Sequence, residues 1–567
     1  MKSHLNNFRD LSKSKIIILL VLIIIIIPFV FKLLRVGFFS MYDDMQVVRL
    51  WQMDKCFKDL QIPCRWVPDL GLGYGYPLFL YYAPLSYYVM EMIHLLGFSL
   101  INAVKFGFII SVFFSGLFFY LLARTYFSKI ASLFTSFLYI YAPYRAASIY
   151  VRGSMGEAWG FAAIPFVFWG FENYLKKRSI RSGLLFSISL AFISVSHNLT
   201  FLMVIPVLVA WILLRIYLEK INAKNIKRII FYALIGFGLA SFYLVPLLFE
   251  RNLVHLETLT SGYFGYRQHF INLKQIFVSL KWGYGPSVMG PNDDVFLGIG
   301  PIHSILVLGG LVAVAFAFRK NRKRFMQGLF LFGVFLFSAF LSHQKSSFIW
   351  ENIKFMEIFQ FPWRFIAISI FCASLLSGFL IDIWDERIKI YIVFLCIFVT
   401  MLMYDSFYKP KDWFVISDYE KLEGVSLKKQ LTASIYDYLP KGAKRAPDDI
   451  ANSDLVIING FVDTRTKNKG SDWFEYKVNV VSENAEVAIP AYSFPNWKVK
   501  VNNNIVPAKP QGDFGLIGLT LNKGEEIISA KLTKSAPRKI GDLISVVCLF
   551  VFFVIYNEKS FRKIVKK

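Results

Sequence analysis

The chain has 567 residues, of which 63 are Lys or Arg and 38 are Asp or Glu, and its formal net charge is +25. Hydrophobic residues make up 56% of it and its mean hydropathy is +0.50, which excludes an ordinary soluble protein. The basic residues cluster between long apolar runs instead of covering one solvated face, so the charge indicates membrane topology and not nucleic-acid binding.

Apolar runs recur along the chain at the length that a membrane-crossing helix needs, about 20 residues. We predict twelve spans, centred on residues 15–36, 101–122, 129–143, 157–174, 181–197, 199–217, 228–249, 297–318, 325–341, 361–381, 388–404 and 540–556. No small-x-small cleavage site follows the first run, so we expect it to remain as an anchor instead of being removed as a signal peptide.

Lys and Arg in short loops favour the cytoplasmic side of a membrane. They cluster at residues 176–181, 220–228, 319–324 and 559–567. Residues 78–97 also look long enough to span, but counting them would place the cluster at 176–181 outside. We therefore predict an amphipathic or re-entrant helix there, on the outer surface, with the N- and C-termini both cytoplasmic.

Three regions follow from this topology. Residues 1–404 form the transmembrane domain, with a first extracytoplasmic loop at 37–100, and residues 540–567 form the last transmembrane helix and a basic cytoplasmic tail. Between them, alternating apolar and polar stretches in residues 405–539 predict an extracytoplasmic β-sandwich domain. The expected strands include 473–480, 497–501 and 516–521, with turns at 502–504 and 523–524. Trp473 and Trp497 could stack on a sugar ring or lie in the core of this domain.

Ionisable side chains are nearly absent from the apolar cores and gather in the predicted outer loops. They are Asp43, Asp44, Arg49, Asp54, Asp69, Arg145, Arg152, Glu157, His197, Glu250, Arg251, His255, Glu257, Arg267, His269, His343, Lys345, Glu357 and Arg364. Such a gathering at the outer boundary is typical of an enzyme site, whereas a transporter more often carries charges at mid-membrane.

Asp43 and Asp44 follow the first span closely. A partly desolvated carboxylate near the headgroups can act as a catalytic base, and an acid pair can also hold Mg²⁺ or Mn²⁺ beside a phosphate. A solvated pair of loop acids is the alternative. Cys56 and Cys64 lie in the same segment and could form a disulfide if that segment is extracytoplasmic.

Arg145 and Arg152 lie in a short predicted outer loop, and Arg364 begins the tenth predicted span. Arg binds phosphate through two parallel hydrogen bonds, so Arg145 and Arg152 are candidates to hold the headgroup of a lipid phosphate, and Arg364 is a candidate for the same site. Anchoring at the membrane interface is the alternative for the first two.

Three further residues are candidates for substrate binding: Glu157, His197 and Asn198. The last two form a tight turn between two apolar runs, so this turn must lie near the membrane surface. A helix-capping Asn beside a satisfied His is the alternative account of that turn.

These motifs resemble the GT-C superfamily of polytopic glycosyltransferases. The resemblance rests on Asp43-Asp44, on residues 73–77 and 82–88, on residues 121–124 and on residues 144–157. Residues 65–69, the Arg-Gly-x-x-x-Glu at 152–157 and the Ser-His-Asn at 196–198 are more narrowly similar to bacterial membrane proteins called 6-pyruvoyl-tetrahydropterin synthase-related. Residues 494–497 resemble the C-terminal β domain of YfhO-like membrane proteins. The zinc site of the soluble synthase is not expected, because the seven His of this chain are dispersed.

The resemblance implies an inverting glycosyltransferase that uses a polyprenyl-phosphate sugar and an envelope glycan, lipid or protein acceptor at the outer face. It implies Asp43 or Asp44 as the base or a metal ligand, and Arg145 and Arg152 at the lipid phosphate. Gln46 and Val47 stand where relatives often place a His, which counts against a metal. Two other classes stay open: a transporter or flippase of lipid-linked saccharides, and a non-catalytic envelope assembly protein whose β domain binds polysaccharide.

Overall fold

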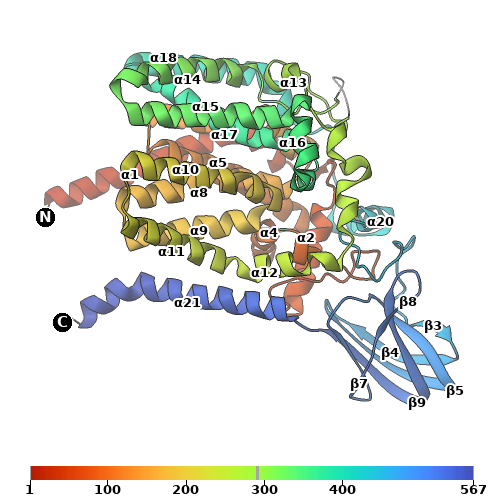
Figure 1. The fold of residues 1–567 in the computed structure, drawn as a ribbon. Helices are drawn as coiled ribbons and strands as arrows, with labels where there is room; N and C mark the ends of the chain where they lie inside the picture. Colours follow the sequence, from red (N-terminus) through yellow and green to blue (C-terminus); the bar gives the residue numbers. More distant parts are fainter. Residues whose placement is uncertain (1, 289–292, 434, 566–567) are drawn as a thin grey trace.

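The computed structural model describes residues 2–288, 293–433 and 435–565, with side chains described between Ile16 and Asn557. Its long helices lie side by side in a bundle (Figure 1). Both ends of the chain lie at one end of this bundle, which we call the terminal end, and a separate domain of strands lies beyond the opposite end, which we call the β-domain end (Figure 1).

The bundle contains thirteen described helices of ten residues or more that correspond to the predicted apolar runs. They are α1 (Lys2–Val30), α5 (Leu100–Ala123), α6 (Lys129–Tyr141), α8 (Met155–Lys177), α9 (Ile180–Ser196), α10 (Asn198–Glu219), α11 (Ala223–Leu239), α12 (Ser241–Glu250), α14 (Pro301–Lys320), α15 (Arg322–Ser342), α17 (Ile366–Asp382), α18 (Glu386–Tyr404) and α21 (Ala536–Val565). The prediction of a mainly helical, multi-pass domain is confirmed.

Length and hydropathy separate these helices into two groups. Within the described residues, eight helices are long and apolar enough to cross a membrane, and the pair α11 and α12, bent by 73°, would make a ninth span. The other predicted runs form α6 and α9, which are shorter, and α8, which carries Glu157 and Glu172. The apolar stretch of α17 is 89% buried and that of α21 only 6%, so α17 is central and α21 lies at the periphery, where it faces lipid.

Polar residues cap the N-terminal ends of several of these helices. The side chains of Ser99, Ser179, Asn222, Asn321 and Asp385 each accept a hydrogen bond from a backbone N–H of the first turn that follows. Such caps satisfy donors that a helix end otherwise leaves unpaired, which matters most where little water is present.

Short elements cover the β-domain end of the bundle. They are β1 (Phe38–Phe39), α2 (Gln46–Lys58), α3 (Leu78–Tyr81), α4 (Leu85–Leu95), α7 (Pro143–Ala146), α13 (Leu273–Phe277), α16 (Ser347–Asn352), β2 (Trp413–Phe414), α19 (Asp418–Lys421) and α20 (Gly424–Thr432). The segment predicted as one outer helix over 78–97 is thus two short helices, α3 and α4. Strand β2 pairs with β1, so part of the predicted 405–539 region packs on the helical domain.

A single seven-stranded antiparallel sheet forms the β domain. Its strands are β3 (Val456–Asn459), β4 (Val462–Lys469), β5 (Trp473–Tyr492), β6 (Trp497–Val501), β7 (Asn504–Val506), β8 (Lys509–Gln511) and β9 (Leu516–Leu532). The order is β3-β5-β9-β6-β7, with β4 added to β5 and β8 to β9. Side chains from both halves of the long strands β5 and β9 meet in one hydrophobic core.

Sequence reasoning identified one of the two turns of this domain correctly. Asn502 and Asn503 have φ angles of 48° and 67°, and they join β6 to β7 as the two-residue hairpin turn that such angles allow. The turn predicted at residues 523–524 is wrong, because β9 runs through Gly524, which pairs with Val480. The irregularity falls instead on β5, between Val480 and Asn484. A glycine inside a strand marks such an irregularity as readily as it marks a turn.

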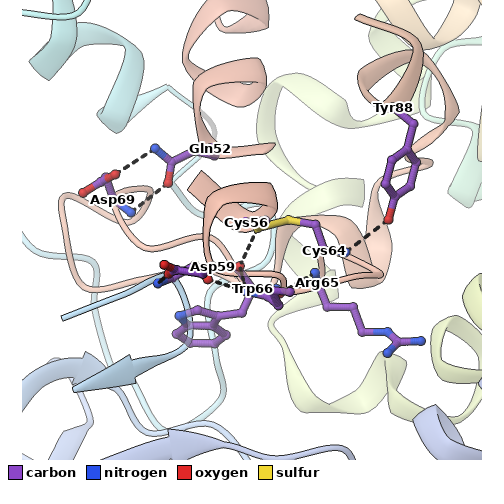
Figure 2. The surroundings of a disulfide bond; sticks show 10 residues. Gln52, Cys56, Asp59, Cys64, Arg65, Trp66, Asp69 and Tyr88 are labelled. Atoms are coloured by element: carbon purple, nitrogen blue, oxygen red, sulfur yellow. Dashed lines mark hydrogen bonds between the residues drawn. A yellow bond between two sulfur atoms is a disulfide. The ribbon is translucent and has the colours of Figure 1, made fainter. Parts of the chain in front are cut away.

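A disulfide between Cys56 and Cys64 joins the end of α2 to the loop that follows (Figure 2). The next two residues of this loop hold the β domain and the last helix. Arg65 forms an ion pair of 2.5 Å with Asp542 of α21, and the ring of Trp66 contacts the rings of Phe494 and Trp497.

These contacts decide between the two roles considered for Trp497. Its ring packs between Trp66 of the first loop and Phe474 of β5. The residue therefore belongs to the packing between the two domains and is not displayed as a platform for a sugar ring.

Glu91 of α4 is fully buried, and both of its carboxyl oxygens lack a hydrogen-bond donor in the described part of the chain. Burial and the nearby Asp54 carboxylate raise the pKa of Glu91 to about 7, against the opposing effects of His94 and Lys58. The folded protein therefore holds this proton over a pH range in which the unfolded chain, with a pKa of 4.5, has lost it.

We expect this carboxyl to make the protein less stable as the pH rises from about 4.5 to about 7, because the folded state binds more protons there than the unfolded state. The variant Glu91→Gln cannot ionise, so it should unfold at a higher temperature than the wild type at about pH 8 and at a similar temperature at about pH 4. Thermal unfolding in detergent at several pH values measures this, with Glu486→Gln at an exposed position of β5 as the control. A difference that does not vary with pH would contradict the assignment.

Candidate functional site

Two backbone hydrogen bonds hold the loop that follows the first predicted span against the residues that precede α8. The N–H of Tyr42 donates to the carbonyl of Val151 at 3.1 Å, and the N–H of Asp43 donates to the carbonyl of Arg152 at 2.8 Å. The first predicted acid therefore lies directly beside the second predicted arginine, although 109 positions separate them along the chain.

Gly153 makes this close approach possible. Its φ is +64°, and a Cβ at this position would clash with the side chain of Met41. Its carbonyl accepts a hydrogen bond of 2.9 Å from the Gln46 side chain, whose Oε1 accepts one of 2.6 Å from the Tyr87 hydroxyl. The junction of the two loops is thus fixed by backbone and by buried side chains.

Asp44 is engaged in an ion pair. Both of its carboxylate oxygens lie 2.7 Å from Nζ of Lys421, which ends α19. The Lys421 side chain is 4% exposed and that of Asp44 is 24% exposed. This pair ties the segment after α18 to the loop that follows the first span, and it leaves Asp43 as the acid without an ion-pair partner.

Asp43 lies among three arginines. Its carboxylate has no hydrogen-bond partner in the part of the chain that the structure describes, and it interacts electrostatically with Arg49, Arg152 and Arg364. Burial lowers the pKa of Arg49 and of Arg152, but nearby groups that include Asp43 outweigh it and raise both pKa values above the usual range. The Arg49 and Arg152 guanidinium groups therefore stay charged.

Aromatic rings hold the three guanidinium groups in place. Arg49 lies 4.5 Å from the centre of the Tyr82 ring, Arg152 lies 4.6 Å from that of Trp363, and Arg364 lies 4.6 Å from that of Phe361. Cations over aromatic faces gain about 0.5–2 kcal/mol each while their N–H groups stay available at the edges. We call Asp43, Arg49, Arg152, Glu157, His197 and Arg364 the Asp43 cluster.

Glu157 neutralises one of the three arginines. Nη1 of Arg152 forms an ion pair with its Oε2, and the Tyr144 hydroxyl donates to its Oε1. The Glu157 side chain is 4% exposed, so removal of either partner would leave a buried charge. Arg364 is held instead by the carbonyl of Phe359 at 2.9 Å and by the Gln360 side chain at 2.7 Å.

His197 joins the same cluster and Asn198 does not. The backbone N–H of Thr200 donates to Nδ1 of His197, so Nδ1 carries no proton and Nε2 is the protonated nitrogen of a neutral ring. This ring interacts electrostatically with Glu157. The Asn198 amide donates to the carbonyl of Tyr81 at 2.7 Å and accepts from the Tyr243 hydroxyl at 2.6 Å, so its polar groups link helices.

That turn also differs from the alternative considered from sequence. The residue that caps α10 is His197 and not Asn198, since Nδ1 accepts the first-turn N–H.

Arg145 lies apart from the cluster. It is fully buried, its Nη2 donates to Ser115 Oγ at 2.9 Å, and its guanidinium lies 5.0 Å from the centre of the Phe161 ring. Residues seven apart share a face of an α-helix, but the π-helical turn η2 (Ala147–Val151) intervenes between Arg145 and Arg152. The two arginines therefore point to different surroundings, and binding of lipid phosphate by Arg145 stays a prediction.

The carboxylates of this site do not suit a divalent cation. Asp44 is neutralised by Lys421, and Asp43 faces guanidinium groups that would repel an ion placed beside it. Among the described residues, no group of three or more His, Cys, Asp or Glu side chains is arranged to hold a metal ion.

Sequence reasoning missed part of this site. Arg49 appeared only among the outer charges, and Tyr82 and Trp363 were not singled out as supports for cations. A signal for Arg49 was present: it stands six positions after Asp43 in a segment that is otherwise mostly apolar up to Trp51. No pattern along the chain pointed to the pairing of Trp363 with Arg152.

Residues 79–411 match the family model described as the 6-pyruvoyl-tetrahydropterin synthase related domain, a membrane protein family. The chain belongs to this family. An uncharacterised protein of Lactococcus lactis subsp. cremoris (strain MG1363) is 25% identical to it over 223 residues, which are 38% of this chain and 35% of the relative. The family member described here thus spans about a third of that relative's length.

Solved structures with some similarity to this family member include the following three. The oligosaccharyltransferase of Archaeoglobus fulgidus in its apo form has a TM-score of 0.44 and 14% identity, over 69% of this chain and 56% of that one. The arabinofuranosyltransferase AftD from Mycobacteria has a TM-score of 0.45 and 13% identity, over 70% of this chain and 27% of that one. ArnT from Cupriavidus metallidurans bound to undecaprenyl phosphate has a TM-score of 0.38 and 13% identity, over 68% of this chain and 64% of that one. The chain spans about half the length of the first and about a quarter of the second.

The different surroundings of the two acids predict different effects of their removal. Asp44→Asn leaves the buried Lys421 ammonium without its carboxylate, so we expect it to lower the free energy of unfolding by about 2–3 kcal/mol. Asp43→Asn breaks no ion pair and should cost well under about 1 kcal/mol. Unfolding of the two purified variants in detergent, followed by tryptophan fluorescence, compares them. An equal loss of stability in both would show that the two acids are not distinguished as described.

Proposed function

We propose that this protein is an integral membrane glycosyltransferase that moves a sugar from a polyprenyl-phosphate carrier to an acceptor hydroxyl at its β-domain end. The observation that carries the proposal is the position of Asp43. It is a carboxylate without an ion-pair partner, it follows the first span directly, and it faces three guanidinium groups. A base beside an anion-binding surface is what transfer from a lipid phosphate requires.

The chemistry assigns a different part to each charge. Asp43 accepts the proton of the acceptor hydroxyl as its oxygen attacks the anomeric carbon from the side opposite the phosphate. The bond from the anomeric carbon to the phosphate oxygen breaks, its electron pair stays on the lipid phosphate, and the configuration at the anomeric carbon inverts. Arg152 and Arg364 donate hydrogen bonds to the phosphate as negative charge accumulates on it.

The charge balance of the Asp43 cluster supports binding of an anion. Three guanidinium groups face two carboxylates, of which Glu157 is already paired with Arg152. A lipid phosphate held by Arg152 and Arg364 would complete this balance while Asp43 stays able to accept a proton. Glu157 then has a positioning part, because it fixes the orientation of the Arg152 guanidinium.

We place this site on the extracytoplasmic side. A disulfide within the first loop fits an oxidising compartment. The basic loops at 176–181, 220–228 and 319–324 all follow or precede helix ends at the terminal end of the bundle, where positive charge favours the cytoplasm. Both chain termini share that end (Figure 1).

The proposal is tested by the lipids that co-purify with the protein. In mild detergent, native mass spectrometry of the wild type and of Asp43→Asn should show a bound polyprenyl-phosphate sugar, and Arg364→Gln should lose it. In membranes that contain the identified donor, Asp43→Asn should release free polyprenyl phosphate about 10²–10⁴ times more slowly than the wild type, because the acceptor is no longer deprotonated.

Matched controls separate this effect from general damage. Arg267→Gln removes an arginine whose side chain is 72% exposed, and Asp448→Asn removes a carboxylate that is 85% exposed, so both should behave as the wild type. Release of polyprenyl phosphate that is as fast in Asp43→Asn as in the wild type would refute the role of the base. Export of an intact lipid-linked sugar would instead identify a transporter.

A further inference from the structure

A polar cavity of about 420 Å³ lies at the other end of the molecule from the Asp43 cluster. Helix α10 relates the two places, since it begins at Asn198, next to His197 of the cluster, and ends at Glu219 in the cavity wall. The remaining wall comes from the turn after α5, from the C-terminal part of α8, from the start of α15 with the connection before it, and from α17. None of these segments contributes to the site described above.

The floor of this cavity is a neutralised network. Glu172 is buried and accepts hydrogen bonds from Trp211 Nε1 at 2.8 Å and from Arg215 at 3.1 and 3.3 Å. Arg215 also donates to Glu219 at 3.1 Å, and Glu219 in turn lies 2.8 Å from Nζ of Lys323. These groups satisfy one another, so they provide a rigid polar base with little charge left over.

The rim of the cavity carries the excess charge. The lining of the whole cavity includes five cations: Lys176, Arg178, Arg215, Lys323 and Arg324. Three carboxylates oppose these five cations: Glu172 and Glu219 in the lining and Asp382, which pairs with Arg324 at 2.8 Å. Two positive charges remain, because the described part of the chain offers Lys176 and Arg178 no carboxylate within ion-pair distance.

Helix α15 adds to the positive potential. It has 21 residues and begins in the wall of the cavity, where the Asn321 side chain caps it by accepting the N–H of Arg324 at 3.0 Å. The N-terminal end of a helix carries partial positive charge, and Lys323 and Arg324 of its first turn face the same space. A concave surface with this potential concentrates anions.

We propose that this cavity binds a phosphate group at Lys176, Arg178 and the first turn of α15. The volume is of the size that holds a small ligand or a headgroup. The guanidinium of Arg178 and the ammonium groups of the rim are suited to charge-assisted hydrogen bonds with phosphate oxygens. The inference does not depend on glycosyl transfer, because it concerns the terminal end of the bundle alone.

The phosphate can belong to an anionic lipid headgroup or to a soluble compound, and two probes distinguish these sources. Thermal unfolding of the full-length protein in detergent is followed with inorganic phosphate, against chloride at equal ionic strength, and with dihexanoyl phosphatidylglycerol, against dihexanoyl phosphatidylcholine. A ligand that binds the folded state raises the unfolding midpoint in proportion to the logarithm of its concentration over Kd. A rise with both probes shows a site for the phosphate group itself, and a rise with the phosphatidylglycerol alone shows a site for a lipid headgroup.

The double variant Lys176→Gln/Arg178→Asn tests the location. Both side chains are exposed and unpaired, and Asn tolerates the φ of 47° at position 178, so the fold should be kept. It should need at least about ten times more ligand for the same rise in midpoint. Lys224→Gln/Lys227→Gln removes two exposed charges near the same end but outside the cavity, and it should match the wild type. No rise with either probe, or an equal rise in both double variants, would overturn the proposal.

Discussion

The backbone pairing of Tyr42 and Asp43 with Val151 and Arg152 is the constraint on which the candidate site depends. It brings the acid that follows the first span to the arginine of the second outer loop and leaves no room for a side chain at Gly153. Because backbone groups make these bonds, substitution of nearby side chains does not remove them directly. Side chains at the site can therefore be exchanged while the backbone that positions them stays in place. Functional residues on loops that a rigid scaffold positions are common in enzymes.

Charge compensation explains why two adjacent acids differ. Lys421 is buried and would be costly to leave unpaired, and it takes Asp44 as its partner. Asp43 instead faces guanidinium groups that are already held by rings or by Glu157, so no single cation neutralises it. Charge compensation also applies in the cavity at the terminal end, where Arg215 pairs with Glu172 and Glu219. The cations at the rim of that cavity, Lys176 and Arg178, have no such partner. At both places the unpaired charge is the one that can meet a ligand.

Hydropathy was enough to predict the helical domain, because a spanning helix must be long and apolar wherever it occurs. The sequence could not distinguish Asp43 from Asp44, since the lysine that decides between them lies 377 positions away. It could not separate Arg145 from Arg152 either, because their divergence depends on a π-helical turn. In the β domain, Gly524 carried the signal of a turn, whereas pairing with β5 kept β9 continuous.

The first outer loop connects the candidate site to the β domain through a short, braced path. Helix α2 carries Arg49 near its start and Cys56 near its end, and the disulfide to Cys64 fixes the position of Arg65 and Trp66. Arg65 is 7% exposed in its ion pair with α21, and Trp66 is buried against two aromatic rings of the β domain. Detaching the β domain would expose these rings, so the contact favours one arrangement. Coupling between distant sites needs an element with two arrangements. The β domain is therefore better understood as fixed on the first loop than as a movable gate.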